Sequence, residues 1–245
     1  MGAKNLTVKR IQEWLNYHQF RTGVDSDFGP ATAECIRDFQ AANGVATSGK
    51  VTAETWKLLV KPMRDALEVP DIAELSAPEA VLAVAERHIT RHPIEIGGPN
   101  CGPWVRLYCK GNDGLSWAWC AGFVTLVMQQ AYFYRQEKPP IEGSVSCDSL
   151  AAQAKRANLF VSRSDLSSGR TDWDALGACC IFLRRRTTTD WTHTGFAMSG
   201  HGQGRQIVFS TIEGNTNDEG SREGFEACRR TRSLNSSHYD FIRFQ

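Results

Sequence analysis

Four polar side chains between residues 120 and 215 are of the types that nucleophilic catalysis requires. Cys120 directly precedes an apolar run that predicts a buried helix. A thiol at a helix N-terminus lies at the positive end of the dipole, among unpaired backbone N–H groups. Both features favour the thiolate and lower the pKa of the thiol, and the same N–H groups can stabilise an oxyanion. Cys120 is therefore the candidate nucleophile.

His193 is the candidate base because it stands among apolar neighbours in a predicted strand of the same region. Glu213 and Asn215 follow at the end of another predicted strand. Side chains alternate along a strand, so these two are expected to point the same way and one of them to orient the imidazole. A nucleophile, a base and an orienting group form the triad of cysteine hydrolases. Which of Glu213 and Asn215 orients His193 stays open. The alternative is that both residues belong to an ordinary strand end and have no role in catalysis.

Tryptophans and arginines near these residues are candidates for substrate contact. Trp117 and Trp119 flank Cys120 closely enough to form an apolar rim, and Trp191 lies beside His193 in the sequence. Residues 184–186 are three consecutive arginines in a predicted loop over residues 184–190. They are interpreted as a solvated basic loop, the usual role of a charge run, with contact to substrate carboxylates as the alternative.

The elements that must position these side chains divide the chain into three parts. Residues 1–61 predict three short helices, with Pro30 opening the second and Thr52 capping the third. Residues 62–77 predict a moderately stiff linker, since prolines interrupt any long helix there. Residues 78–245 predict an α+β domain, with helices followed by strands at residues 178–183, 191–198 and 206–213.

Residues 6–60 resemble the small three-helix peptidoglycan-binding domain of many cell-wall enzymes. The resemblance rests on the Asp-x-Asp-Phe-Gly-Pro-x-Thr loop at residues 25–32 and on Phe39, Gln40, Gly44, Gly49 and Thr55. Each of these residues has a local structural reason, so the pattern identifies a fold before it identifies an activity. A spacer or a partner-docking bundle is the alternative.

Three ordered motifs in residues 80–245 resemble the cysteine, histidine-dependent amidohydrolase/peptidase (CHAP) domain and its NlpC/P60 relatives. They are Trp-Cys-Ala-Gly-Phe-Val at residues 119–124, His-Thr-Gly-Phe-Ala at 193–197 and Ile-Glu-Gly-Asn-Thr at 212–216. The resemblance implies a papain-like α+β fold, in which the cysteine helix packs on an antiparallel sheet that carries the histidine. It also implies amide cleavage in peptidoglycan, with Cys120 as nucleophile, His193 as base and then acid, and Glu213 or Asn215 holding the imidazole.

Composition excludes several other classes of protein and of site. The 245 residues hold 28 basic and 27 acidic side chains, so no long-range field attracts nucleic acid or an anionic membrane. The longest apolar stretch falls far short of the ~20 residues that span a bilayer. Eight cysteines without a C-x-x-C pair read as reduced thiols and not as zinc ligands. Some CHAP relatives bind calcium through acidic residues before the cysteine, but here only Asp113 stands there, so no metal or other cofactor is expected.

We therefore expect a two-domain peptidoglycan hydrolase that cuts either a peptide bond of the wall or the amide between muramic acid and alanine. The N-terminus has no apolar core of signal-peptide length, so we expect synthesis in the cytoplasm and action on the wall after release or injection. A phage endolysin and an injected antibacterial toxin both fit, and a toxin implies an immunity protein as partner. The alternatives are an inactive wall-binding protein and a cysteine protease or acyltransferase with a non-wall target.

Overall fold

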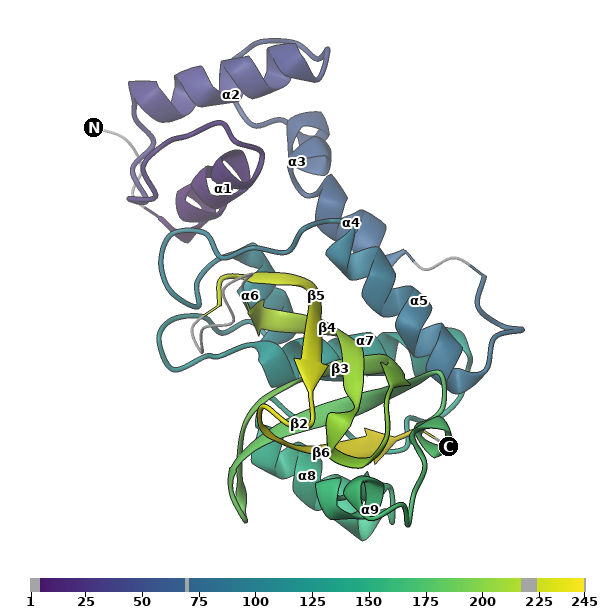
Figure 1. Ribbon diagram of the computed structural model, residues 1–245. Helices are drawn as coiled ribbons and strands as arrows, with labels where there is room; N and C mark the ends of the chain where they lie inside the picture. Colours follow the sequence, from purple (N-terminus) through teal and green to yellow (C-terminus); the bar gives the residue numbers. More distant parts are fainter. Residues whose placement is uncertain (1–4, 69–70, 217–223, 245) are drawn as a thin grey trace.

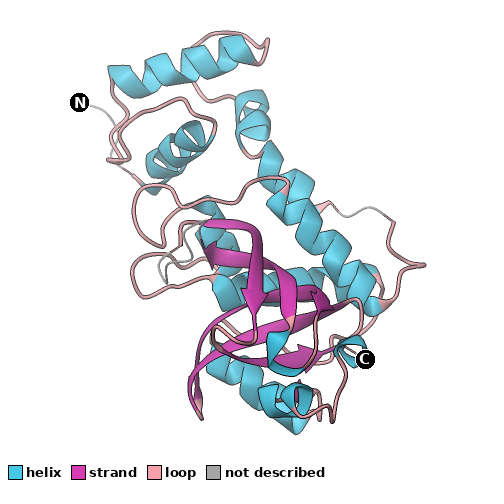
Figure 2. Cartoon of the chain, viewed as in Figure 1, coloured by secondary structure: helices cyan, strands magenta, loops and turns pink. Residues whose placement is uncertain are grey.

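The computed structural model (Figure 1) describes residues 5–68, 71–216 and 224–244. Residues 1–4 of the first predicted part, 69–70 of the predicted linker, and 217–223 and 245 of the third part lie outside these ranges. Helices combine with a six-stranded antiparallel sheet, which confirms the α+β prediction (Figure 2). The helices are α1 (Leu6–Tyr17), α2 (Pro30–Ala42), α3 (Ala53–Leu59), α4 (Lys61–Leu67), α5 (Ala77–Ile89), α6 (Pro103–Tyr108), α7 (Cys120–Tyr134), α8 (Cys147–Arg156) and α9 (Arg163–Ser167), with short 3-10 helices η1 (Trp173–Leu176) and η2 (Gly204–Gln206).

The sheet has the strand order β1-β6-β2-β3-β4-β5, and every neighbouring pair is antiparallel. Its strands are β1 (Phe160–Val161), β2 (Cys179–Thr187), β3 (Asp190–His201), β4 (Val208–Thr216), β5 (Glu226–Ser233) and β6 (His238–Arg243). The strands predicted from sequence correspond to β2, β3 and β4. β2 runs through Thr187, so the prediction of a loop from residue 184 is wrong: Arg184 and Arg185 belong to the strand and pair with β3.

Helices α1, α2 and α3 form the N-terminal unit, as predicted. Pro30 opens α2, and the Thr52 hydroxyl caps α3 by accepting the Thr55 backbone N–H at 3.2 Å. The Gln12 amide holds the loop between α1 and α2, donating to Asp25 at 2.8 Å and accepting the Ser26 N–H at 2.9 Å. The helices share an apolar core of Ile11, Trp14, Leu15, Ile36, Phe39 and Leu59.

The segment predicted as a linker begins as helix α4. α4 follows α3 directly, and Val60 serves as the end of one helix and the start of the other. Pro62 lies in the first turn, where its missing N–H leaves no hydrogen bond unmade, so it does not interrupt the helix. Ala66 and Ile72 are buried in the main core. This segment is therefore packed against the rest of the chain along much of its length.

The N-terminal unit contacts the larger part of the protein through α1 and α6. The carboxylate of Glu13 is fully buried and pairs with the guanidinium of Arg106, whose Nη1 lies 3.1 Å from Oε1. Beside this pair the rings of Trp14 and Trp104 meet with centroids 6.5 Å apart. An ion pair and an aromatic contact thus join the two units.

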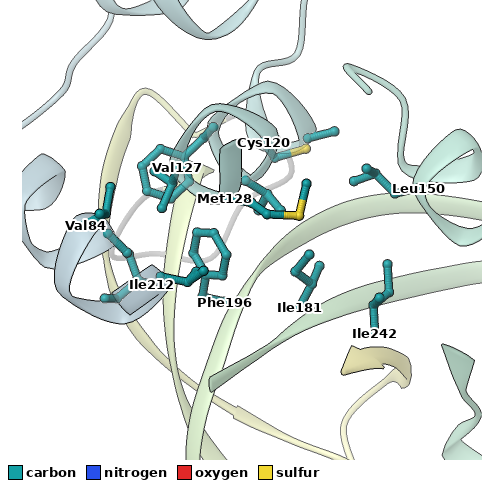
Figure 3. Packing of buried hydrophobic residues seen from close by; sticks show 14 of the residues in the cluster. Val84, Cys120, Val127, Met128, Leu150, Ile181, Phe196, Ile212 and Ile242 are labelled. Atoms are coloured by element: carbon teal, nitrogen blue, oxygen red, sulfur yellow. The ribbon is translucent and has the colours of Figure 1, made fainter. Parts of the chain in front are cut away.

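Helix α7 crosses the sheet at β3 and β4 and forms the centre of the main core (Figure 3). Cys120, Val127 and Met128 of this helix are buried with Phe196 of β3 and Ile212 of β4. Helix α7 is apolar on nearly all sides because it is surrounded by other buried side chains of the main core.

The start of α7 lies against the end of α6. A Cβ at Gly122 would collide with the backbone carbonyl of Tyr108, so glycine is required for this close approach. On the opposite face of the sheet, α9 and η1 cover a second apolar cluster that contains Phe182, Phe209 and Phe241. Across the described ranges, no helix combines the length and apolarity that a membrane span needs.

Candidate active site

Cys120 is the first residue of α7, as predicted, and its side chain is 4% exposed. Its sulfur receives a hydrogen bond from the Thr194 backbone N–H and hydrogen-bonds to the side chains of Cys147 and His193. The nucleophile predicted from sequence is thus surrounded by groups that stabilise a negative charge on sulfur.

His193 lies on β3 and connects Cys120 to Glu213. Its Nε2 is 2.7 Å from Oε2 of Glu213, while the ring also hydrogen-bonds to Cys120. With Nε2 committed to the carboxylate, Nδ1 is the nitrogen left for the thiol. The structure therefore brings together the predicted nucleophile, base and orienting group in one chain of hydrogen bonds.

Gly195 lets the Glu213 side chain reach across β3. A Cβ at this position would lie 2.8 Å from Cγ of Glu213 and 2.7 Å from the carbonyl oxygen of Ile212. Both distances are below ordinary van der Waals contact. The His-x-Gly pattern of the third part of the chain therefore has a steric reason.

The Glu213 carboxylate is fully buried and has two partners besides His193. Arg232 of β5 donates from Nε to Oε1 at 2.8 Å and from Nη2 to Oε2 at 2.5 Å. The Thr211 hydroxyl donates to Oε1 at 2.5 Å. A forked guanidinium contact of this kind fixes both the charge and the plane of a carboxylate.

The charges of the three groups reinforce one another. The hydrogen bond from Cys147, together with His193, holds the pKa of Cys120 well below its usual value, although burial opposes this. Burial also disfavours a charged imidazole, but hydrogen bonds to Cys120 and Glu213 outweigh it and raise the pKa of His193 to about 9. Burial raises the pKa of Glu213, and Arg232 and His193 reverse this and lower it to about 2. The favoured state is a thiolate–imidazolium pair beside a carboxylate.

Cys147 is a partner that sequence reasoning missed. It is the first residue of α8, which Ser146 caps by accepting the Ser149 N–H, and its side chain is 8% exposed. Its hydrogen bond to Cys120 raises the pKa of the Cys147 thiol well above the usual value, so Cys147 stays protonated and donates. The sequence Ser-Cys-Asp-Ser could have predicted the start of a helix, but nothing in the sequence indicates the contact with Cys120.

Arg232 was also missed, and its strand explains why. β5 reads Glu-Ala-Cys-Arg-Arg-Thr-Arg-Ser, which has no apolar alternation. A strand was therefore not predicted there, and Arg232 had no assigned neighbour. Its position beside Glu213 depends on the pairing of β4 with β5.

Asn215 does not reach His193. The register between β4 and β5 shifts between Glu213 and Thr216, and Asn215 adopts a positive φ of 54°. The alternation that would place Asn215 beside Glu213 is broken there, and the Asn215 amide donates to Asn100 at 3.2 Å instead. Of the two candidates, Glu213 is the one that contacts the imidazole.

The tryptophans occupy different positions from those expected. Trp119 is fully buried and donates from Nε1 to Glu95 at 2.9 Å, and Trp191 is buried and donates to Asp240 at 2.9 Å. Neither forms an exposed rim, because each indole is packed inside the protein. Trp117 is partly buried and packs against the main core.

Two cavities border the candidate site, one at His193 and one at Asn215. The first has a volume of 250 Å³ and is lined by His193, Thr192, Ser237 and four arginines, Arg184, Arg185, Arg186 and Arg232. The second, of 490 Å³, is lined by residues that include Ala118, Asn100 and Asn215.

Asp113, the one acidic residue considered for calcium, pairs with Arg106. Within the described ranges, no three His, Cys, Asp or Glu side chains gather as metal ligands.

Comparison with known proteins finds a match in the N-terminal unit. Residues 4–59 match the family model described as "Putative peptidoglycan binding domain". The match covers α1, α2 and α3, supports peptidoglycan as a partner, and supports a function related to the cell wall. No curated protein and no solved structure matches this chain.

Proposed function

We propose that this protein is a cysteine-dependent peptidoglycan hydrolase that cleaves an amide bond. The observation that carries the proposal is the hydrogen-bonded chain Cys120–His193–Glu213 at the start of a buried helix. A helix that bears the cysteine and an antiparallel sheet that bears the histidine also favour the papain-like CHAP fold. The N-terminal unit supplies the wall target.

The first half of the reaction forms a thioester. The Cys120 thiolate attacks the carbonyl carbon of the scissile amide, and the backbone N–H groups at the start of α7 stabilise the oxyanion. His193 then gives its proton to the leaving amine, and the C–N bond breaks. In the second half, His193 takes a proton from water, which attacks the thioester and releases the acid and the thiolate. Glu213 holds the imidazole and stabilises its charge throughout.

The N-terminal unit holds the catalytic part at its substrate. Binding of one chain segment to the wall raises the effective concentration of scissile bonds for the other. We further propose that the protein is made in the cytoplasm and reaches the wall after release, as an endolysin, or after injection, as a toxin that an immunity protein neutralises.

The test is digestion of purified peptidoglycan by the wild type, Cys120→Ala and Cys35→Ala. Cys35 lies in the N-terminal unit, so its replacement is the matched control for loss of a thiol. We expect Cys120→Ala to release wall fragments at least ~10³-fold more slowly, since a triad acts as a unit, and Cys35→Ala to match the wild type. Fragment masses distinguish an amidase from an endopeptidase. Equal release by Cys120→Ala would overturn the mechanism, and absence of release by the wild type across several wall types would favour an inactive binding protein or a non-wall target.

A further inference from the structure

The 250 Å³ cavity beside His193 is lined by four arginines and by no acidic side chain among the described residues. Arg184, Arg185 and Arg186 come from β2 and Arg232 comes from β5. Strands fix the backbone positions of these arginines more firmly than a loop would, so the positive charge is built into the sheet beside His193.

The carboxylates around the cavity balance three of the four arginines. Arg232 pairs with Glu213, Arg186 with Asp190 at 2.5 Å, and Arg185 with Asp240 at 3.6 Å. Arg184 donates from Nε to the Ser237 hydroxyl at 3.3 Å, and within the described ranges it has no carboxylate partner. The imidazolium of His193 is balanced by the Cys120 thiolate, so Arg184 is the source of the excess positive charge of the cavity.

Arg184 is the direct cross-strand neighbour of His193. The two residues face each other in the register of β2 and β3, and opposed residues of an antiparallel pair project from the same face of the sheet. The guanidinium of Arg184 therefore lies on the side of the sheet from which His193 works. The planar fork of arginine suits a carboxylate, with which it forms two parallel hydrogen bonds.

We propose that this cavity binds a free carboxylate on the leaving-amine half of the substrate, with Arg184 as the specificity-determining contact. The assignment to the leaving half rests on the proposed function, in which His193 protonates the leaving amine, and His193 lines this cavity. The positive cavity itself stands independently of that function. Stem peptides carry free carboxylates, and a wall in which the recognised one is amidated presents a neutral group instead.

The first test needs no wall substrate. Alkylation of Cys120 is followed by mass spectrometry with iodoacetate, which carries a carboxylate, and with neutral iodoacetamide. We expect Arg184→Gln to slow iodoacetate about 10- to 100-fold and to leave iodoacetamide unchanged, the size of effect that loss of a hydrogen bond to a charged group produces. Arg184→Lys keeps the charge and recovers part of the rate.

The control for this test is Arg170→Gln, which removes an exposed arginine that pairs with Asp165 away from the cavity. It is expected to leave both alkylation rates at the wild-type values. A ratio of iodoacetate to iodoacetamide rates that is the same in Arg184→Gln and the wild type would overturn the carboxylate site. Circular dichroism establishes that each variant is folded.

The second test uses stem-peptide fragments that differ only in a free carboxylate or a carboxamide on the leaving half. The wild type is expected to show a lower KM for the carboxylate form, and Arg184→Gln to show the same KM for both. Equal KM values in the wild type would overturn the specificity. If neither fragment is cleaved, the proposed function fails, whereas the alkylation ratio still decides whether the cavity binds carboxylates.

Discussion

The side chains of Cys120 and Cys147 hydrogen-bond to each other, and each cysteine is the first residue of a helix. Two helix N-termini therefore converge on one pair of sulfur atoms. Cys147 is the donor, because this contact raises the pKa of its thiol. Cys120 is the acceptor, because the same contact lowers its pKa and favours the thiolate. The relationship gives Cys147 a measurable role as a positioning residue.

Replacement of Cys147 by alanine is expected to raise the pKa of Cys120, because the thiolate loses a donor. The pH midpoint of iodoacetamide alkylation at Cys120 should move upward, and kcat/KM near neutral pH should fall about tenfold. Cys147→Ser keeps a donor and should recover part of both effects. Cys180→Ala removes a buried thiol in the other apolar cluster and should leave the midpoint unchanged. An unchanged midpoint in Cys147→Ala would contradict the role of this hydrogen bond.

The pH profile of the reaction should follow a thiolate–imidazolium pair. Activity is expected to fall on the alkaline side near pH 9, where His193, whose pKa is raised to about 9 by Cys120 and Glu213 against the effect of burial, loses the proton for the leaving amine. On the acid side it is expected to fall where Cys120, whose pKa is well below its usual value because of Cys147 and His193, becomes protonated. The measurement is kcat/KM against pH. An alkaline limb near the ordinary histidine pKa of 6.5 would argue against the pair.

Glu213→Gln should distinguish a carboxylate that orients and stabilises the His193 imidazolium from a side chain that only packs in the core. The amide cannot stabilise the imidazolium as a carboxylate does, so kcat is expected to fall about 10²–10⁴-fold and the alkaline limb to move to lower pH. Glu226→Gln is the matched control, since Glu226 also pairs with a histidine, His92, at 2.8 Å. This control should retain the wild-type pH profile.

The same substitution has a defined effect on stability against pH. The pKa of Glu213 is lowered to about 2, so its contribution is present above 4.5 and is lost as pH falls toward 2. The pKa of His193 is raised to about 9, so its contribution is present below 6.5 and is lost as pH rises toward 9. The difference in Tm between the wild type and Glu213→Gln should therefore be largest from pH 4.5 to 6.5. A difference that does not vary with pH would count against these shifts.

Arg106→Ala should loosen the contact between the N-terminal unit and the rest of the chain. The substitution removes the guanidinium partner of the buried Glu13 carboxylate and leaves it with Lys9 at 3.7 Å, which costs about 1–3 kcal/mol. Calorimetry is expected to show a lower Tm, with the N-terminal unit unfolding before the remainder. Arg37→Ala breaks an exposed pair with Glu34 and should leave the transition in place. An unaltered transition in Arg106→Ala would show that the buried pair does not couple the two units.

Local patterns were sufficient for the parts of the site that depend on neighbours in the sequence. An apolar run after a turn predicted that a helix begins at Cys120, and apolar neighbours placed His193 in a strand. The capping residue Thr52 also marked a helix start correctly. The catalytic roles of Cys120 and His193 stay predictions.

Features that depend on strand pairing could not be predicted. Arg232 reaches Glu213 only because the polar strand β5 pairs with β4, and Arg184 opposes His193 only through the register of β2 and β3. The bulge that turns Asn215 away has no local signal, since strand alternation predicts the opposite orientation. Trp119 was expected at an exposed rim because, in the sequence alone, a large apolar side chain beside a cysteine suits substrate contact as well as it suits packing in the core.

In the proposed hydrolase, the buried pair of Glu13 and Arg106, with the ring contact of Trp14 and Trp104 beside it, would set the position of the N-terminal unit relative to Cys120. The N-terminal unit cannot rotate without exposing these groups or leaving a charge unpaired. A glycan strand held by α1, α2 and α3 would therefore lie at one separation and one angle from Cys120. The bonds within reach are then those at a single offset along the polymer, so the spacing of cross-links in the wall, and not the length of a flexible connection, decides how many bonds each bound molecule can cut.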